Sequence, residues 1–399
     1  MSGASVSQFL RAAAHVRRRC AEIRQIARGV PHILAPHVPC RPDEPLRLRF
    51  VYRDLGAPTR YRVHHQIEQA RLAGLIVQDA PLDRTTDLFD LTRCDLLYLY
   101  RLPLAPLSMA LCAAARRQGV PIVFDSDDLV WDPREREYNY LDDHYSPAQV
   151  ARLLWETRRT RALMSRADAF VFATPYLARL AGQSFRQPTY VNPNALSTAM
   201  LAAAEDACAE RSRRPPRADL VVGYFCGTPH VHDEDLASIA PALCAMLEQH
   251  PHARLRVYGA VELYGALADP RYAAQIERRP AVDWHELPWH IAQVDLNIAP
   301  LVDNPQRRAK SAVKYLEAAV LGVPTIAARL DPYERDIVDG TTGLLAATHQ
   351  EWITSLTCLI RAPELRARLG AAARAQVLAQ HTTAARAANF AAIIAEVAR

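Results

Sequence analysis

Short apolar segments alternate with helical segments twice along this 399-residue chain, and this alternation limits the possible folds more than any other feature. Strands of a parallel sheet are buried on both faces and read as short apolar runs, and the connections between them are usually helices. The pattern therefore predicts parallel sheets with helices on both faces. Because the alternation stops and then restarts, we predict two doubly wound α/β domains in series.

The first series predicts an N-terminal domain over residues 46–195. Its expected strands lie at 46–53, 96–101, 120–124 and 169–174, and its expected helices at 60–73, 106–118 and 148–166. Gly74 and Gly119 follow two of these helices, as is common where a last turn ends in the left-handed conformation.

A basic, proline-containing stretch at 211–216 interrupts the pattern, and we predict a linker over 196–219. The second series then predicts a C-terminal domain over 220–380, followed by a final helix within 381–399. Its expected strands lie at 220–225, 254–258, 295–299 and 324–328, and its expected helices at 234–249, 310–321, 350–361 and 363–380.

The N-terminal segment 1–45 differs from the rest in charge. Residues 1–49 carry a net charge of +6, whereas the whole chain carries +5, so the remainder is nearly neutral and a nucleic-acid partner is not expected. Apolar residues recur at steps of three and four over 6–28, which predicts a basic amphipathic helix before a proline-rich connector. Such a helix either lies on an anionic membrane surface or packs on the N-terminal domain.

The composition is that of a folded soluble protein, with 50% hydrophobic and 23% charged residues. We find no run of eighteen apolar residues and no apolar leader, and the eight cysteines are scattered without a C-x-x-C pair. We therefore expect a cytoplasmic location, which becomes peripheral at the inner membrane if residues 6–28 contact it. No metal or other cofactor is expected.

The helix expected at 310–321 carries the only two lysines among the 48 basic residues, Lys310 and Lys314. This helix follows the strand at 295–299, and ligands of doubly wound sheets bind beyond the carboxyl ends of strands. The first turn of a helix also offers free amides that suit an anion. The sequence therefore predicts a phosphate-binding site here.

On this expected helix, Lys310, Lys314 and Glu317 share one face at steps of four and three, with Ser311 at its start. The ammonium groups would stabilise a departing nucleotide diphosphate, and Glu317 would accept hydrogen bonds from ribose hydroxyls. A solvated face with a Lys314–Glu317 pair is the alternative.

Other polar residues follow other expected strands. After 220–225, Gly227 would let the backbone approach a phosphate and Thr228 adds a hydroxyl group, although a plain strand-to-helix turn is the alternative. In the N-terminal half, the residues expected to face a cleft and contact an acceptor are Arg62, His65, Asp125, Asp127 and Asp128. Capping of a turn by the aspartates and a surface Arg/His face are the alternatives.

Several of these segments resemble group 1 (family 4) glycosyltransferases. In the second half the resemblance rests on 223–229, 295–301, 310–318, 322–327 and 339–345, and in the first half on 61–63, 124–128 and 191–194. It implies a GT-B fold, with two Rossmann-like domains facing a cleft. It also implies a UDP- or GDP-sugar donor, a carbohydrate or lipid-linked acceptor, and transfer with retained configuration, usually in cell-envelope polysaccharide or glycolipid synthesis.

By this resemblance Glu317 is expected at the donor ribose, Gly227 and Thr228 at the phosphate loop, and Lys310 and Ser311 at the diphosphate and sugar. We assign Lys310, Lys314 and Asp127 as the catalytic candidates. Asp125 and Asp127 also match the D-x-D pattern that holds a metal in another class of glycosyltransferases, but the GT-B layout does not need one and no metal is predicted.

The chain departs from the family pattern at two places. Many members carry a second glutamate where this chain has Ala309, and an arginine and a lysine after the glycine loop, where this chain has Thr228, His230 and His232. These departures leave an alternative open: a non-catalytic GT-B protein that binds a sugar nucleotide, or a subunit of a polysaccharide assembly complex.

Overall fold

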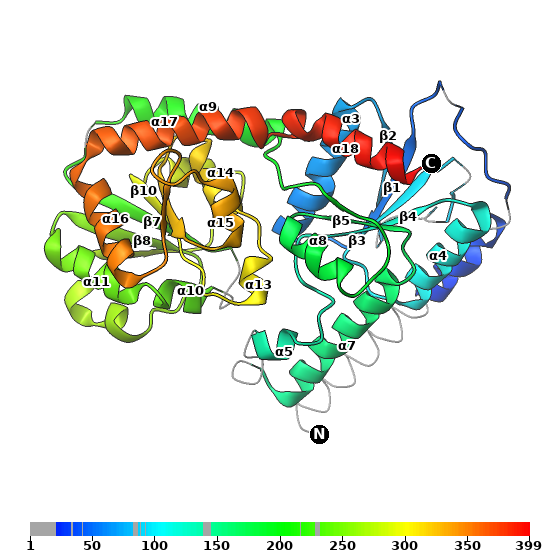
Figure 1. Ribbon diagram of the computed structural model, residues 1–399, viewed down its shortest axis with the longest axis horizontal. Helices are drawn as coiled ribbons and strands as arrows, with labels where there is room; N and C mark the ends of the chain where they lie inside the picture. The colour runs from blue at the N-terminus through cyan, green and yellow to red at the C-terminus, as the bar shows by residue number, and fades with distance from the viewer. Residues whose placement is uncertain are drawn as a thin grey trace. The chain divides into compact units, whose positions relative to one another are not determined.

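The computed structural model describes residues 21–32, 35–41, 43–82, 87, 89–91, 93–138, 145–215, 217–227 and 232–399. The chain divides into two compact units (Figure 1). Unit 1 comprises Met1–Asn192 and Ala387–Arg399, and unit 2 comprises Pro193–Arg386. Of the helix expected at 6–28, only the part from residue 21 lies in the described residues, where 21–32 are helical.

Among the described residues, unit 1 holds a six-stranded sheet in the order β2-β1-β3-β4-β5-β6, with every neighbouring pair parallel. The strands are β1 (Arg47–Tyr52), β2 (Ile76–Pro81), β3 (Leu96–Tyr100), β4 (Ile122–Ser126), β5 (Ala169–Phe172) and β6 (Thr189–Val191). The four strands expected from the sequence are confirmed. The two that were not expected, β2 and β6, form the edges of the sheet and are less buried.

The helices of unit 1 lie close to their expected places. They are α2 (Ala57–Thr59), the π-helical turn η1 (Arg60–His64), α3 (His65–Leu72), α4 (Pro106–Gln118), α5 (Glu135–Tyr138), α7 (Pro147–Met164) and α8 (Pro175–Gly182). Gly119 ends α4 in the left-handed conformation, at φ 69°, as its position in the sequence predicts.

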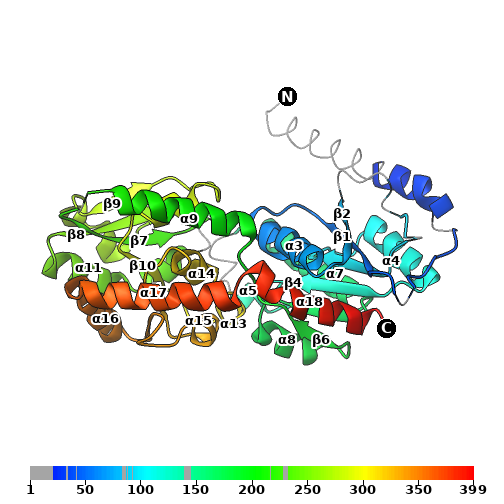
Figure 2. The same cartoon turned by 90° about the horizontal axis from the view of Figure 1, so that it is seen from above.

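The last helix of the chain, α18 (Thr383–Val397), contributes to the core of unit 1 (Figure 2). Phe390, Ile393 and Ile394 are buried with apolar side chains of β1, β3 and α3. The ring of Phe390 lies 5.9 Å from that of Tyr98, which in turn stacks on Phe50 at 4.4 Å. The first unit is therefore built from two separate parts of the chain.

Unit 2 holds a second six-stranded sheet among the described residues, in the order β12-β11-β10-β7-β8-β9, again with parallel neighbours. Its strands are β7 (Leu220–Phe225), β8 (Ala253–Tyr258), β9 (Ile276–Arg279), β10 (Leu296–Ala299), β11 (Thr325–Ala328) and β12 (Leu344–Ala346). The four expected strands are confirmed here too, and the two that were not expected, β9 and β12, are again the edges.

Helices cover both faces of this sheet (Figures 1 and 2). Helices α11 and α16 pack against one face of the sheet. Helix α14 packs against the other face and contacts α12 and α17. The helices are α9 (Thr198–Arg213), α10 (Asp233–Ala237), α11 (Ala240–Gln249), α12 (Leu287–Ile291), α13 (Pro305–Arg308), α14 (Val313–Ala319), α15 (Asp331–Asp336), α16 (His349–Arg361) and α17 (Pro363–Gln380).

The segment 196–219, for which the sequence predicts an alanine-rich helix, contains the 16-residue helix α9, which packs against α12. One expectation about unit 2 needs revision. The helix expected at 234–249 is two helices, α10 and α11, because Pro241 stands in the first turn of α11 and cannot continue a preceding helix. Within the described residues, no helix has the length and apolar content needed to cross a bilayer.

Candidate functional site

The strand order of unit 2 reverses between β7 and β10, since β8 and β9 lie on one side and β11 and β12 on the other. Ligands of doubly wound sheets bind at such a switch point, beyond the carboxyl ends of the two central strands. The chain leaves β7 at Cys226 and Gly227, and leaves β10 at Pro300. The loops after these two strands are therefore the candidate ligand site.

Two glycines shape the end of β7. Gly259, after β8, has φ +101°, and a Cβ on it would lie 2.1 Å from the Cys226 carbonyl oxygen, so only glycine lets the two loops approach this closely. Gly227 is exposed, and a Cβ on it would meet no described atom within 4 Å. Gly227 thus has the open surface that the prediction requires, whereas Thr228 lies outside the described residues.

The helix predicted to begin at Lys310 begins instead at Val313, and α14 has only seven residues. A separate short turn, α13, precedes it, and the Lys310 N–H bonds back to the Arg307 carbonyl at 3.1 Å. Lys310 and Ser311 therefore lie in the connector, and the predicted face of Lys310, Lys314 and Glu317 does not form on one helix. The physical reason is the strong N-cap of α13, where the Asn304 side chain accepts from the Arg307 N–H at 2.8 Å.

Lys314 has an unusual environment for a lysine. Its ammonium nitrogen is buried without a hydrogen-bond partner among the described residues, and it lies 4.4 Å from the centroid of the Tyr224 ring. Burial lowers the pKa of Lys314. The backbone of Lys314 is fixed by the buried Asn297, whose side-chain amide donates to the Lys314 carbonyl at 3.2 Å and to the Thr325 hydroxyl at 3.1 Å.

An ion-pair network joins the loops after β7 and β10. The imidazole Nδ1 of His232 lies 2.6 Å from Asp235 Oδ2, and Asp235 Oδ1 accepts from the Val302 N–H at 2.9 Å and from Arg307 Nε at 3.2 Å. Asp235 is fully buried, which by itself raises the pKa of a carboxyl group, but the hydrogen bond from His232 and the charge of Arg307 outweigh burial and lower the pKa of Asp235.

The remaining predicted donor residues flank this network. Ser311 Oγ accepts a hydrogen bond from Asn194 Nδ2 at 2.8 Å, and Glu317 is half-buried on α14, one turn after Lys314. The described donor residues that the sequence predicted thus lie in the connections after β7 and β10 and on α14, the helix that follows β10. Their roles toward a donor stay predictions.

Sequence reasoning missed the groups that position the predicted ones: Tyr224, Asp235, Asn297 and Arg307. The sequence pattern predicts only a strand at Tyr224 and Asn297 and only a helix at Asp235. Two signals for these groups are present in the sequence. One is the spacing of His232 and Asp235, three apart at the start of a helix, and the other is an asparagine inside the otherwise apolar strand β10.

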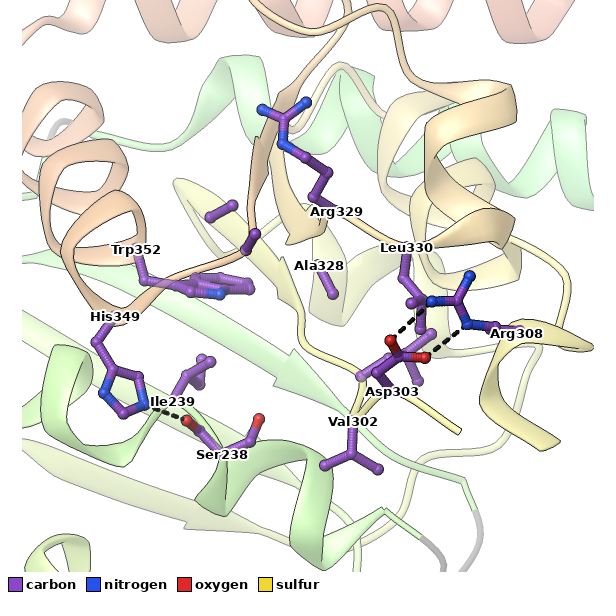
Figure 3. A pocket seen from close by; sticks show the side chains of 13 residues that line it. Ser238, Ile239, Val302, Asp303, Arg308, Ala328, Arg329, Leu330, His349 and Trp352 are labelled. Atoms are coloured by element: carbon purple, nitrogen blue, oxygen red, sulfur yellow. Dashed lines mark hydrogen bonds and ion pairs between the residues drawn. The ribbon is translucent and has the colours of Figure 1, made fainter. Parts of the chain in front are cut away.

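A pocket of about 380 Å³ lies beside this network in unit 2 (Figure 3). It is lined by the loops after β10, β11 and β12 and by Trp352 of α16. Figure 3 shows Asp303 paired with Arg308 and His349 hydrogen-bonded to the Ser238 carbonyl. The distance from His349 Nε2 to that carbonyl oxygen is 2.9 Å. None of the predicted donor residues lines this pocket.

In unit 1, Arg62 and Asp125 are both fully buried and form a bidentate ion pair, with N–O distances of 2.9 and 2.6 Å. Gln66 and Tyr98 also donate to Asp125 Oδ2, at 3.1 and 2.6 Å. Asp125 lies on the same face of β4 as Val123, and η1 and α3 cover that face. This burial does not fit the predicted contact of Arg62 and Asp125 with an acceptor, because both side chains are committed to each other.

His65 is also buried, at 3% exposure, with its ring edge-on to that of Tyr61, so it does not present the predicted acceptor surface either.

Asp127 and Asp128 lie just beyond β4 and are half-buried. The Tyr100 hydroxyl donates to Asp127 at 3.0 Å, and Arg101 pairs with both aspartates at 3.4 and 3.3 Å. Burial raises the pKa of Asp127. The acceptor and catalytic roles of these two aspartates stay predictions.

Comparison with known proteins agrees with the fold. Residues 240–392 match a family model described as glycosyl transferase-like. A comparison with curated proteins finds no match. Among solved structures, a sucrose-phosphate synthase from Thermosynechococcus elongatus is similar at a TM-score of 0.61 and 13% identity, over 88% of this chain and 99% of that chain.

Two further structures are similar over nearly the same range. Anabaena HepE in complex with UDP and glucose gives a TM-score of 0.59 at 13% identity, covering 88% of this chain and 100% of that one. A glycosyltransferase from Rickettsia africae gives 0.60 at 11% identity, covering 89% and 99%. This chain therefore has the GT-B fold of two Rossmann-like units, and residues 240–392 resemble the glycosyl transferase-like family.

Proposed function

We propose that this chain is a glycosyltransferase that moves a sugar from a UDP- or GDP-sugar to an acceptor with retention of configuration and without a metal. The observation that carries the proposal is the buried ammonium of Lys314 at the switch point of the second sheet, which has no hydrogen-bond partner in the part of the chain that the structure describes. A buried charge without a hydrogen bond is costly, and such groups concentrate at sites that bind ligands. The match of residues 240–392 to a glycosyl transferase-like family supports the same reading.

In this proposal unit 2 binds the donor. The diphosphate lies against Lys314 and Lys310 beside the exposed Gly227, and Glu317 accepts hydrogen bonds from the ribose. Negative charge grows on the diphosphate as the sugar leaves, and a fixed ammonium in a poorly solvated place stabilises that charge. Anabaena HepE, which shares the fold, was solved with UDP and glucose, and this supports a nucleotide-sugar donor.

Unit 1 binds the acceptor, a carbohydrate or a lipid-linked saccharide, through Asp127 and Asp128. Asp127 has a raised pKa and a hydrogen bond from Tyr100, and so is suited to contact an acceptor hydroxyl. The Arg62–Asp125 pair holds η1 against the end of β4. Cell-envelope polysaccharide or glycolipid synthesis in the cytoplasm, with contact at the inner membrane through residues 6–28, is the setting that we propose.

Replacement of Lys314 with methionine tests the donor site. The Lys314→Met variant keeps most of the side-chain length but loses the charge, and we expect about 10- to 100-fold weaker binding of UDP-glucose or GDP-mannose. Glu317→Gln should weaken binding as well. The matched control is Arg254→Met, which removes a cation at the opposite, amino-terminal end of β8. Isothermal titration calorimetry measures all four proteins, and wild-type affinity in both site variants would remove the assignment.

A non-catalytic protein that binds sugar nucleotides is the second candidate. Many similar proteins carry a glutamate where this chain has Ala309, so this chain offers no carboxylate at that position. Ala309 is fully buried. Donor binding without hydrolysis or transfer, measured by nucleotide release over a panel of saccharide and lipid-linked acceptors, would favour this candidate. Release of UDP or GDP that depends on an acceptor would exclude it.

A further inference from the structure

The imidazole ring of His232 is held in one orientation. Its Nδ1 lies 2.6 Å from the carboxylate of Asp235, which can only accept a hydrogen bond, so Nδ1 carries the proton and Nε2 of the neutral ring is left with a lone pair. The backbone is held as well, because the Tyr224 hydroxyl donates to the His232 carbonyl at 3.1 Å. Asp235 is in turn fixed by Val302 and Arg307.

This ring stands at the proposed donor site. His232 is the N-cap of α10, in the connection that follows β7 at the switch point. Tyr224 links His232 to Lys314, because its hydroxyl bonds to one and its ring lies under the ammonium of the other. Nε2 of His232 has no hydrogen bond to another described residue, and 16% of the side chain is exposed.

The charges around His232 come from each neighbouring element. Asp235 and Asp233 lie on α10, Lys314 and Glu317 on α14, and Arg307 and Lys310 on α13 and the connector after it. Burial, followed by the positive charge of Lys314, lowers the pKa of His232 to about 4, and Lys310 adds to this effect. At neutral pH and without a ligand the ring is therefore uncharged.

An anion at this site would reverse that balance. A diphosphate beside Lys314 cancels the positive charge that opposes protonation and adds a negative charge of its own, and both changes favour imidazolium. The proton comes from solvent and binds at Nε2, while the Nδ1–H group continues to donate its hydrogen bond to Asp235. The new Nε2–H then donates a charge-assisted hydrogen bond to a phosphate oxygen.

We infer that His232, oriented by Asp235, binds the donor diphosphate and takes up one proton as the nucleotide sugar binds. This inference rests on the proposed function, since it names a further contact of the same site. It makes donor binding pH-dependent through a group that the sequence-based donor residues did not include. As pH rises above neutrality, proton uptake becomes harder and the affinity for the donor falls.

Calorimetry in buffers of different ionisation enthalpy measures the proton directly. UDP-glucose and GDP-mannose are the probes, because a diphosphate esterified at both ends does not itself titrate near neutral pH. For the wild-type chain at pH 7.5 we expect uptake approaching one proton per donor bound, and up to about a tenfold loss of affinity per pH unit above that.

Two variants separate His232 from its surroundings. His232→Asn should remove the uptake and weaken binding, while His232→Lys, which supplies a permanent cation, should restore affinity without proton uptake. His349→Asn is the control, since His349 is an exposed histidine of the same unit with its own partner at the Ser238 carbonyl. It should leave the uptake unchanged.

The outcomes distinguish the inference from the proposed function. If the wild-type chain binds a UDP- or GDP-sugar with no proton uptake, or if His232→Asn keeps the uptake, the inference is overturned and the donor site stands. If neither sugar nucleotide binds to the folded wild-type chain, the proposed function is wrong and the inference falls with it.

Discussion

Asp125 and Lys314 are both buried ionisable groups, but they differ in what surrounds them. Asp125 accepts hydrogen bonds from Arg62, Gln66 and Tyr98, so its charge is fully compensated inside unit 1. Lys314 faces the Tyr224 ring and has no hydrogen-bond partner among the described residues. A compensated buried charge serves the fold, whereas an uncompensated one is tolerated where a ligand completes it.

The Asp125→Asn variant should lower the free energy of unfolding by about 3–5 kcal/mol, because it leaves the buried guanidinium of Arg62 without a counter-charge. Asp303→Asn is the matched control. It breaks a bidentate pair with Arg308, but Asp303 is 61% exposed, and its loss should cost less than about 1 kcal/mol. Urea unfolding measures both, and equal costs for the two variants would contradict the structural role of Asp125.

At the scale of elements, the strands that the sequence did not predict are the edge strands of the two sheets. The eight strands recognised from the sequence are the inner ones, which are apolar on both faces because helices cover both. The edge strands β2, β6 and β9 have mostly half-buried or exposed residues. An apolar pattern cannot identify a strand that is only partly removed from water.

In unit 2, the loops after β7 and β8 approach each other closely because residue 259 is glycine, which has no Cβ. Gly259→Ala places a Cβ 2.1 Å from the Cys226 carbonyl at φ +101°, and we expect it to cost at least about 2 kcal/mol and to weaken UDP-sugar binding by displacing the end of β7. Gly265→Ala is the control, since it has φ +57° but open space around its Cβ.

Both substitutions place a side chain at positive φ, but Gly259→Ala adds the clash with Cys226 and a φ farther from the left-handed helical region. Chemical denaturation gives the stabilities and calorimetry the donor affinities. A Gly259→Ala protein with the stability and donor affinity of Gly265→Ala would show that the contact between the two loops does not matter.

At the scale of the whole molecule, the chain returns to unit 1 after completing unit 2. Residues 387–399 belong to the first unit although almost two hundred residues of unit 2 precede them in the chain. Their apolar side chains fill a face of the first sheet that α3 covers only in part. Unit 1 is therefore complete only when the last helix is present.

The Phe390→Ala variant should lower the free energy of unfolding of unit 1 by about 3–5 kcal/mol, the usual cost of emptying a buried aromatic site. Leu378→Ala, at a position 41% exposed on α17, is the control and should cost less than about 1 kcal/mol. Hydrogen exchange assigns each loss to a unit. Unchanged protection of β1 and β3 in Phe390→Ala would contradict this packing.

The amino-acid sequence by itself determined the two-domain α/β class, the inner strands and most helices, because these depend on local apolar pattern, glycine and proline. It also predicts a donor site at Gly227, Lys314 and Glu317, after the ends of β7 and β10, since ligand sites follow the ends of strands in this fold class, and this site stays a prediction.

Only the tertiary structure decided which polar groups are available. Arg62 and Asp125 are 63 positions apart in the sequence, and no local pattern shows that they neutralise each other in the core. The same holds for the ring of Tyr224 beneath Lys314, for the link between His232 and Asp235 across to Arg307, and for α18 in the core of unit 1. Burial and pairing arise from contacts between distant segments, and those exist only once the chain has folded.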